Sequence, residues 1–383
     1  MHERARGAES PLAAHLAALP ECYDATVFWS DAELEELRGS PLHAQTEALR
    51  AQTAADFQEL HTALLSQQPE LFPPAQCGLE AYRWALATLW SRAMDLPVGD
   101  SGACMRLVVP WIDMCNNDSE LPVCHAHERS GNAVVLLAGR AYAAGQQVNI
   151  NYGLTSHATA LRLHGFAPRG ARVEVPLYAE MSDAADLYDA KRRLLDRAGV
   201  RPGVPFMLTL DEPMPPLLLL ALRAQRLSAP DLAGVEGAGL RPGVRVSVDN
   251  ERAALGALRD GIEAMLRAYP TACAADEALL ADAALPERRR AAVELRLGEK
   301  RVLEAAAREL ALRLKALDDE PAESAEDAAR RTMGGAKAPE AAAALTAYFE
   351  TLLAEEEAAA AQPAEAGEAE EKEQQSSALD ALD

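Results

Sequence analysis

The 383-residue chain lacks the features that mark membrane, secreted and common nucleotide-binding proteins. Its six cysteines form no CxxC pair, which predicts reduced thiols in an intracellular protein. The composition does not distinguish cytoplasm, nucleus and plastid. Met1 to Ser10 holds no apolar signal core, and the chain has no run of about 18 apolar residues. GxGxxG, GxxxxGK(S/T), HExxH and GxSxG motifs are absent, which excludes the commonest nucleotide-binding, zinc-protease and hydrolase signatures.

Basic side chains are scarce, with 37 Lys and Arg against 59 Asp and Glu and a net charge of −22. Because nucleic-acid binding requires cations that neutralise phosphates, we predict no nucleic-acid partner. A protein with basic segments is the better electrostatic match, so we expect a protein partner and no membrane partner. Residues 318–383 alone hold 18 acidic and 4 basic side chains and few large apolar ones. We predict that this acidic, Ala- and Glu-rich tail is largely disordered.

The hydrophobic pattern predicts an α+β protein in which helix dominates. Residues 11–95 have mostly helical spacing, with Ser30 as an N-cap and a helix over 48–65 and another over 79–94. Short strands are predicted over residues 106–110, 133–137 and 148–152, with residues 144–147 as a hairpin connection between the last two and a turn at 116–119. Helices return beyond residue 175, over residues 184–198, 213–227, 250–268 and 286–317.

Two groups of residues have plain structural interpretations. The three tryptophans at 84, 90 and 111 are expected to be core aromatics rather than a stacking surface. The cluster Cys124, His125 and His127 is short and polar, and we expect an exposed loop there rather than a zinc site. A metal-bound scaffold stays open as a weaker alternative, and no metal ligand is assigned.

Residues 108–166 contain the densest group of motifs. They read V-V-P-W-I-D-M-C-N-N-D-S, then a variable stretch, then A-G-Q-Q-V-N-I-N-Y-G and S-H-A-T-A-L-R-L-H-G-F. Taken alone, this block predicts only strand, turn, hairpin and helix. In that plain interpretation Asn116 caps a turn and Tyr152 ends a strand.

The block resembles the end of a SET domain, the catalytic domain of one class of protein methyltransferases. That family has a proline, D-x-x-N-H-S, an insert, A-G-E-x-V-x-I-x-Y-G, S-N-A-E and G-F in this order. Residues 246–251, 266–270, 287–294 and 295–300 resemble motifs of the Rubisco LSMT-type substrate-binding domain, and residues 82–85 with 91–92 resemble the helical insert of these SET domains. The SET positions that match are Pro110, Asp113, Asn116, Ala144, Gly145, Val148, Ile150, Tyr152, Gly153, Ser156, Gly165 and Phe166.

The resemblance implies a partial SET β-fold with a helical insert, spanning residues 1–174. The insert would cover about 11–95 and the carboxyl-terminal SET core about 103–170. A mostly helical substrate-binding domain would follow over 175–317 and the acidic tail over 318–383. The branch implied is that of Rubisco large-subunit and actin-histidine methyltransferases.

Family membership implies S-adenosylmethionine as the cofactor. Tyr152 would be the catalytic residue, beside the transferred methyl group. Arg92 would approach the cofactor's carboxylate, Asn116 would hold its amino-acid end, and Asn117 and Phe166 would complete the cofactor site. The expected substrate-binding residues are Met94, Trp111, Ile112 and His164.

Three departures from the family pattern bear on activity. The family's amino-terminal strands and G-x-G loop belong before residue 10, so we expect a fragment, a wrongly assigned gene start or a chain without that loop. The usual Asn-His pair is Asn116-Asn117, and the second and fourth residues of Ser-Asn-Ala-Glu are His157 and Thr159. His164 stands where plant relatives have a second tyrosine.

We predict a protein N-methyltransferase that prefers lysine to histidine. Histidine-modifying relatives carry a tryptophan directly before the motif's aspartate and an asparagine two residues after the insert's arginine. Ile112 and Met94 occupy these positions. Trp111 is displaced by one residue, which on a strand would turn it to the opposite face. An actin-histidine-type enzyme and a protein-binding remnant without catalysis remain the alternatives.

Overall fold

The computed structural model describes residues 1–98, 103–122, 125–128, 133–154, 156–168, 170–235 and 239–319. Over these residues helices predominate and the strands form four two-stranded sheets, which confirms the α+β prediction. The α-helices are α1 (His2–Ala5), α2 (Ala13–Ala18), α3 (Asp31–Glu35), α4 (Pro41–Ala63), α5 (Leu79–Arg92), α6 (His157–His164), α7 (Tyr188–Arg197), α8 (Pro216–Gln225), α9 (Ala229–Val235), α10 (Val248–Ala268), α11 (Cys273–Leu280) and α12 (Glu287–Asp318).

Short 3₁₀ helices and strands lie between them. The 3₁₀ helices are η1 (Gly7–Glu9), η2 (Thr26–Phe28), η3 (Leu65–Gln67) and η4 (Ile112–Met114). The strands are β1 (Met94–Val98), β2 (Ala103–Leu107), β3 (Asn116–Asn117), β4 (His125–Glu128), β5 (Ala133–Leu136), β6 (Asn149–Ile150), β7 (Val175–Leu177) and β8 (Phe206–Leu208).

The described residues divide into two compact units. Unit 1 comprises residues 1–179, 203–215 and 256–315. Unit 2 comprises residues 180–202 and 216–255 and, among the described residues, 316–319. This division by compactness does not follow chain order, whereas the predicted domains do, and the predicted boundaries stay predictions. The tail beyond residue 319 lies outside the described residues.

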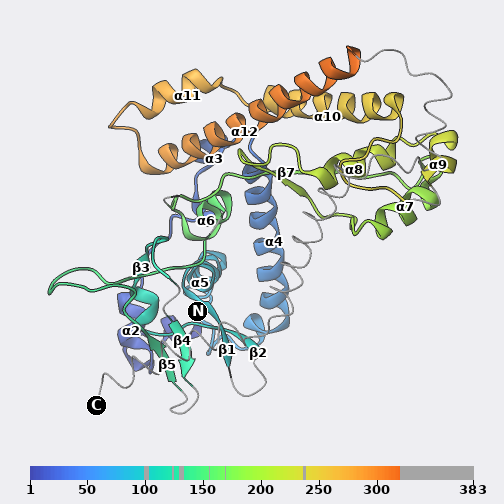
Figure 1. Ribbon diagram of the computed structural model, residues 1–383. Helices are drawn as coiled ribbons and strands as arrows, with labels where there is room; N and C mark the ends of the chain where they lie inside the picture. Colours follow the sequence, from blue (N-terminus) through green and yellow to red (C-terminus); the bar gives the residue numbers. More distant parts are fainter. Residues whose placement is uncertain are drawn as a thin grey trace. The chain divides into compact units, whose positions relative to one another are not determined.

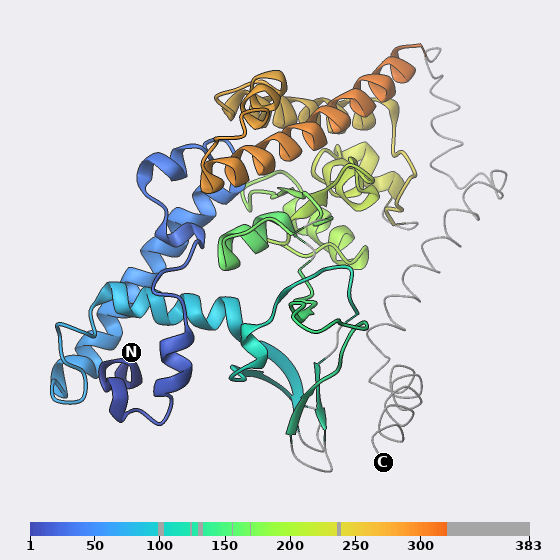
Figure 2. The same ribbon diagram turned by 90° about the vertical axis from the view of Figure 1, so that its left-hand side faces the viewer.

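The amino-terminal helices of unit 1 begin where the sequence places capping residues. Ser30 caps α3 in a full capping box with Glu33, as the sequence predicted. Ser40 caps α4, which has Pro41 at its first position and starts seven residues before the predicted helix. Helices α4 and α5 lie beside one another, as both views show (Figures 1 and 2).

The tryptophans divide between core and surface. Trp84 is buried in a cluster with Leu19, Tyr23 and Ala87, and Trp90 packs against the same cluster. Trp111 keeps 75% of its surface exposed, so the prediction of a core aromatic was wrong for this residue. Its backbone is left-handed, with φ of 79°, and it starts a 3₁₀ helix rather than continuing a strand.

The predicted hairpin between residues 133–137 and 148–152 was wrong. β5 pairs antiparallel with β4, and β6 pairs in parallel with β3. The predicted turn at 116–119 begins as strand β3, and the turn follows at Asp118 to Leu121. The predicted strand 106–110 is displaced to β2, which pairs with β1 and is mostly exposed rather than buried. Periodicity cannot choose among partners for strands this short.

Unit 2 contains a buried ion pair. Arg223 on α8 donates hydrogen bonds to both carboxylate oxygens of Glu251 on α10, and both side chains are about 95% buried. The Asn250 amide donates to the Arg223 carbonyl at 3.0 Å. A buried charge is tolerated only when it is paired and hydrogen-bonded, which this arrangement provides.

Helix α12 contributes buried charged residues to the core of unit 1. Asp276 on α11 is fully buried and accepts hydrogen bonds from Arg296 at 2.7 Å and from Lys300 at 2.6 Å. Burial alone would raise the pKa of Asp276, but hydrogen bonds from Arg296, Lys300 and Thr271 outweigh it and lower the pKa. The network fixes α11 against α12.

A second buried carboxyl in unit 1 is that of Glu299 on α12, and its hydrogen-bond partners among the described residues are hydroxyl groups rather than cations. Glu299 accepts hydrogen bonds from the Ser40 hydroxyl at 2.9 Å and the Tyr269 hydroxyl at 3.0 Å. Burial raises the pKa of Glu299 to about 8, although both hydrogen bonds act in the opposite direction. The carboxyl is therefore protonated at neutral pH in the folded protein.

This raised pKa predicts a loss of stability with rising pH. The unfolded chain releases the Glu299 proton near its ordinary pKa of 4.5, whereas the folded protein holds it to about pH 8. The contribution of Glu299 to the free energy of unfolding should therefore decrease as the pH rises from 4.5 to about 8. Glu299→Gln should remove this pH dependence in denaturant titrations, whereas Glu287→Gln, at an exposed position of α12, should keep it. Equal pH profiles for wild type and Glu299→Gln would contradict the assignment.

Gly165 ends α6 in a left-handed conformation, with φ of 79°. Its amide donates to the carbonyls of Ala160 and Leu161, both at 3.1 Å. A Cβ at this position would overlap the backbone of Asp24 and would lie 2.7 Å from the Ala25 nitrogen. The glycine lets the end of α6 approach the segment before η2.

Gly165→Ala should therefore destabilise the protein by more than about 2 kcal/mol, because strain and overlap add. Gly145 has a similar φ of 82° but no atom within 4 Å of an added Cβ. Gly145→Ala should cost only about 1 kcal/mol from backbone strain. Thermal unfolding of the two variants measures the difference, and similar losses would contradict the close approach.

Candidate active site

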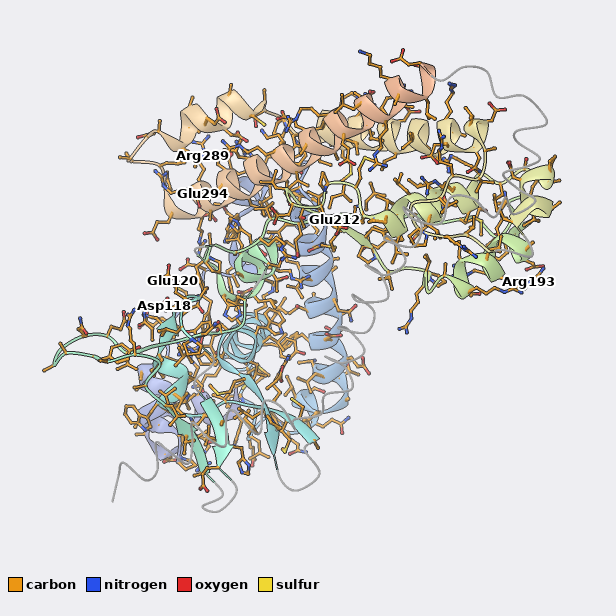
Figure 3. The ribbon with its side chains drawn as sticks, viewed as in Figure 1. Asp118, Glu120, Arg193, Glu212, Arg289 and Glu294 are labelled. Carbon is orange, nitrogen blue, oxygen red and sulfur yellow. The ribbon has the colours of Figure 1, made fainter. Side chains whose placement is uncertain are left out.

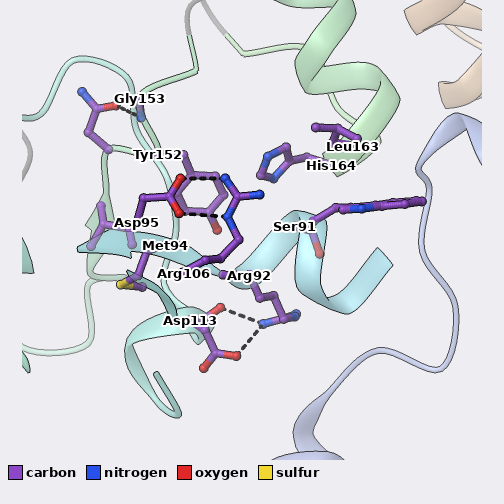
Figure 4. Close-up of a pocket in the computed structure, with 14 residues that line it drawn as sticks. Ser91, Arg92, Met94, Asp95, Arg106, Asp113, Tyr152, Gly153, Leu163 and His164 are labelled. Atoms are coloured by element: carbon purple, nitrogen blue, oxygen red, sulfur yellow. Dashed lines mark hydrogen bonds and ion pairs between the residues drawn. The ribbon is translucent and has the colours of Figure 1, made fainter. Parts of the chain in front are cut away.

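Unit 1 contains a cavity of about 410 Å³ among α5, β1, η4, α6 and the segment after β6. Figure 4 shows Arg92, Asp113 and His164 around it, from α5, η4 and α6, together with Tyr152 from the segment after β6. The lining residues are Trp90, Ser91, Arg92, Ala93, Met94, Asp95, Arg106, Asp113, Ile150, Asn151, Tyr152, Gly153, Leu163 and His164.

Tyr152 is held at both its backbone and its hydroxyl. Its amide donates to Oδ1 of Asn117 at 3.0 Å, and its hydroxyl donates to the Cys115 carbonyl at 2.6 Å. The parallel pairing of β3 with β6 brings these segments together, with Asn117 opposite Ile150. Burial raises the pKa of Tyr152, with the Arg92 cation opposing, so the phenol stays neutral at ordinary pH.

Arg92 and Met94 line the cavity where α5 ends and β1 begins. Arg92 donates to the Asp113 carbonyl at 2.7 Å, and its Nη1 lies 3.7 Å from the Asp113 carboxylate. The Arg92 Nε is buried without a hydrogen-bond partner. A cation with a spare donor at the wall of a cavity suits an anionic group.

His164, the last residue of α6, faces Tyr152 across the cavity wall. Its ring centroid lies 5.6 Å from that of Tyr152 and 5.9 Å from that of Phe166. Its Nδ1 is buried without a hydrogen-bond partner. Burial lowers the pKa of His164 to about 4, so the imidazole is neutral at physiological pH.

The structure brings four of the nine predicted site residues to the cavity wall: Arg92, Met94, Tyr152 and His164. Asn117 and Phe166 contact Tyr152 but do not themselves line the cavity. The other three predicted residues, Asn116, Trp111 and Ile112, do not line the cavity. The orientation inferred for Trp111 assumed a strand and was wrong, because the residue lies at the start of η4.

Four residues at or beside this cavity had no role assigned from the sequence: Asp95, Arg106, Asp113 and His15. Asp95 and Arg106 stand opposite each other on β1 and β2 and form a bidentate ion pair at 2.6 and 2.8 Å. A sequence prediction of the β1–β2 hairpin would have placed Asp95 opposite Arg106. Asp113 is a fully buried carboxylate and His15 lies beside it, and no local pattern reveals that contact.

Metal ligation finds no support in the part of the chain that the structure describes. No group of three or more His, Cys, Asp or Glu side chains there is placed to hold a metal ion. Cys124 of the alternative metal hypothesis lies outside the described residues. No helix among the described residues combines the length and hydrophobicity that a membrane span requires.

Comparison with solved structures identifies the class of fold. The structure of Rubisco LSMT bound to AdoMet matches with a TM-score of 0.73 and 26% identity, over 87% of this chain and 77% of the other. The SET domain of LSMT bound to MeLysine and AdoHcy matches with the same TM-score and 25% identity, over the same shares of the two chains. The chain has the fold of the LSMT SET-domain structures, which confirms the predicted SET fold.

Sequence comparison defines the relatives. Residues 182–303 match the family described as Rubisco LSMT substrate-binding. The Rubisco large subunit N-methyltransferase of Nicotiana tabacum is 28% identical over 76% of this chain and 61% of its own length. The actin-histidine N-methyltransferase of Homo sapiens is 27% identical over 78% of this chain and 52% of its own length. The resemblance to this branch of protein methyltransferases is confirmed, and the chain spans only about half to two thirds of these relatives.

The buried imidazole yields a prediction about acid stability. The unfolded chain protonates His164 near its ordinary pKa of 6.5, whereas the folded protein does so only near 4. The His164 contribution to stability should therefore be lost as pH falls through this interval. His164→Phe should remove that loss and stabilise the protein at pH 7 by about 1 kcal/mol, because an unpartnered buried nitrogen disappears. Denaturant titrations measure both effects, and an imidazole NMR titration midpoint near 6.5 would contradict the assignment.

Proposed function

We propose that this chain is an S-adenosylmethionine-dependent protein N-methyltransferase that prefers a lysine acceptor. The observation that carries the proposal is the hydrogen bond that the Tyr152 hydroxyl donates to the Cys115 carbonyl. Tyr152 and Arg92 line the same cavity. The names of the relatives support the reaction class, since they are lysine and histidine N-methyltransferases. Structures of Rubisco LSMT have been solved with AdoMet and with AdoHcy bound.

The residues present fit such a cofactor. Arg92 has a buried Nε without a partner, and a guanidinium is the side chain best suited to a carboxylate. Asn116 follows η4 and would hold the amino-acid end, while Asn117 and Phe166 support Tyr152 beside it. Asn116 is exposed and does not line the cavity, so its side chain would have to turn toward a cofactor bound there.

S-adenosylmethionine would supply a methyl group on a cationic sulfur, and attack by a nitrogen lone pair would break the methyl–sulfur bond and leave a neutral thioether. The Tyr152 hydroxyl donates its hydrogen bond to the Cys115 carbonyl. The lone pairs of the hydroxyl oxygen are therefore available to a positively polarised methyl group. The cavity wall aligns donor and acceptor, which is the main contribution that a protein can make to an in-line displacement.

A lysine acceptor must be uncharged before it can attack. Met94 and Leu163 give the cavity apolar wall, and such surroundings disfavour the ammonium form of a lysine. His164 is neutral there and adds no positive charge to repel the substrate. No strong base is required, since the released proton can leave to solvent once desolvation lowers the amine's pKa.

Histidine is the second candidate acceptor, because actin-histidine N-methyltransferases match at 27% identity. Ile112 and Met94 stand where such enzymes would have tryptophan and asparagine, and Met94 offers no amide to hold an imidazole. The partner would be a protein, bound through the segment over 175–317 that includes the matched substrate-binding family. A protein-binding chain without catalysis is an outcome that the following experiment detects.

Calorimetric titration with S-adenosylmethionine should give a micromolar Kd for the 383-residue chain. Arg92→Lys and Asn116→Ala should each weaken binding by about tenfold, because a bidentate and an amide contact are lost. Arg83→Lys on the same helix serves as the control, because Arg83 pairs with the exposed Glu80 and does not line the cavity. A well-folded chain that shows no heat of binding would remove the proposed cofactor.

Labelled methyl transfer to a protein extract tests catalysis and the acceptor. We expect methyl-lysine after hydrolysis of the labelled proteins. Tyr152→Phe should lower kcat by about 10²-fold with a smaller change in the cofactor's Kd, because the aligned oxygen is lost while the ring remains. Methyl-histidine would establish the second candidate, and binding without transfer to any protein would favour the non-catalytic role.

A further inference from the structure

His15 lies beside the buried carboxylate of Asp113, far from it in sequence. The residue belongs to the short helix α2, and its Nε2 is 3.3 Å from Oδ2 of Asp113. The His15 side chain is 12% exposed and that of Asp113 is fully buried. Asp113 lines the cavity, whereas His15 does not. His15 is therefore placed to act on the cavity only through Asp113.

Arg92 is the other cationic neighbour of Asp113, and the two compete for its charge. Arg92 Nη1 lies 3.7 Å from the carboxylate but directs its hydrogen bond to the Asp113 carbonyl at 2.7 Å. Neither carboxylate oxygen has a hydrogen-bond partner. Burial raises the pKa of Asp113, whereas His15 and Arg92 favour its charged form. The negative charge is thus shared between His15 and Arg92.

We propose that His15 is a positioning residue that controls, through Asp113, how strongly Arg92 holds the carboxylate of the cofactor. The inference rests on the proposed function, since it takes Arg92 as the carboxylate's partner. When His15 is protonated, Asp113 pairs with it and Arg92 is released for the ligand. When His15 is neutral, the unpaired carboxylate draws Arg92 toward itself. Cofactor affinity should therefore fall as pH rises.

Few other charges face this pair within the part of unit 1 that the structure describes. Tyr152 interacts electrostatically with Asp113, but burial raises the pKa of its phenol and keeps it neutral. Cys115 faces Tyr152 from the same side. Helix α2 packs against α1 and η1 and, through Leu16, against the tryptophans of α5, whose charged residues besides Arg92 are Glu80 and Arg83, paired with each other. Helices α1 and η1 and the residue between them carry His2, Glu3, Arg4, Arg6 and Glu9.

Among the described residues, the charged side chains of α1, Arg6 and η1 make no contact with His15 or Asp113. Arg6 and Glu3 form an exposed ion pair with each other, and Arg4 lies over the ring of Trp84 at 4.0 Å. A pH dependence that disappears with His15 can therefore be attributed to the contact between His15 and Asp113.

The test compares two ligands across about pH 6 to 8. S-adenosylmethionine carries the carboxylate, and methylthioadenosine lacks the whole amino-acid end. In wild type the Kd of S-adenosylmethionine should rise about three- to tenfold over this range, within the limit for one linked proton. In the His15→Gln variant the Kd should not change with pH and should stay near the value that wild type shows at high pH. Methylthioadenosine should bind with little pH dependence in both proteins.

His43→Gln is the matched control. His43 lies 3.4 Å from Glu47 on α4, but both side chains are partly or largely exposed. This variant should keep the wild-type pH profile. Melting temperatures of both variants, measured at each pH, separate a binding effect from a general loss of structure.

Each result has a defined meaning. A pH-independent Kd for S-adenosylmethionine in wild type, or an unchanged profile in His15→Gln, overturns the inference and leaves the proposed function intact. The same slope for methylthioadenosine overturns the link through Arg92. If neither ligand binds, the proposed function fails and this inference fails with it. Asp113→Asn should likewise remove the pH dependence of the Kd for S-adenosylmethionine, because no carboxylate remains between His15 and Arg92.

Discussion

The structure of unit 1 depends on how its buried carboxylates are stabilised. A buried charge must be paired, hydrogen-bonded or neutralised, because its desolvation costs several kcal/mol. Asp276 is paired with Arg296 and Lys300 and stays ionised. Glu299 meets only hydroxyl groups, and its pKa rises to about 8. These two solutions fix α12 against α11 and against the start of α4, and they use interactions between segments far apart in the chain.

Asp113 is the third case and the one that the candidate site uses. Its carboxylate lies between His15 and Arg92 without a hydrogen bond to either. Incomplete pairing of a buried charge is unfavourable for stability, and among the described residues the buried Nε of Arg92 also has no hydrogen-bond partner. Tyr152 and His164 complete the wall with neutral groups, since burial moves both pKa values away from neutrality. Asp118 and Glu120 after β3, labelled in Figure 3, do not line the cavity, whereas the ion pair of Asp95 and Arg106 does.

Helices were predictable and strand partners were not. The helices predicted over 250–268 and 286–317 are found as α10 and α12 with ends that differ by two residues or fewer, because burial of one face repeats every 3.6 residues. The sheets consist of strands of two to five residues, too short for alternation to decide register or partner. The predicted hairpin failed for that reason, and β7 and β8 were not predicted at all.

The sequence by itself determined the class of fold and the identity of Tyr152, Arg92, Met94 and His164 as site candidates, since the order of short motifs survives along the chain. Only the tertiary structure decided which candidates share one cavity and which, like Trp111, stay in solvent. It also decided the charge state of Glu299 and His164 and the contact between His15 and Asp113. These properties depend on burial and on distances between segments, and neither is encoded in any local pattern of residues.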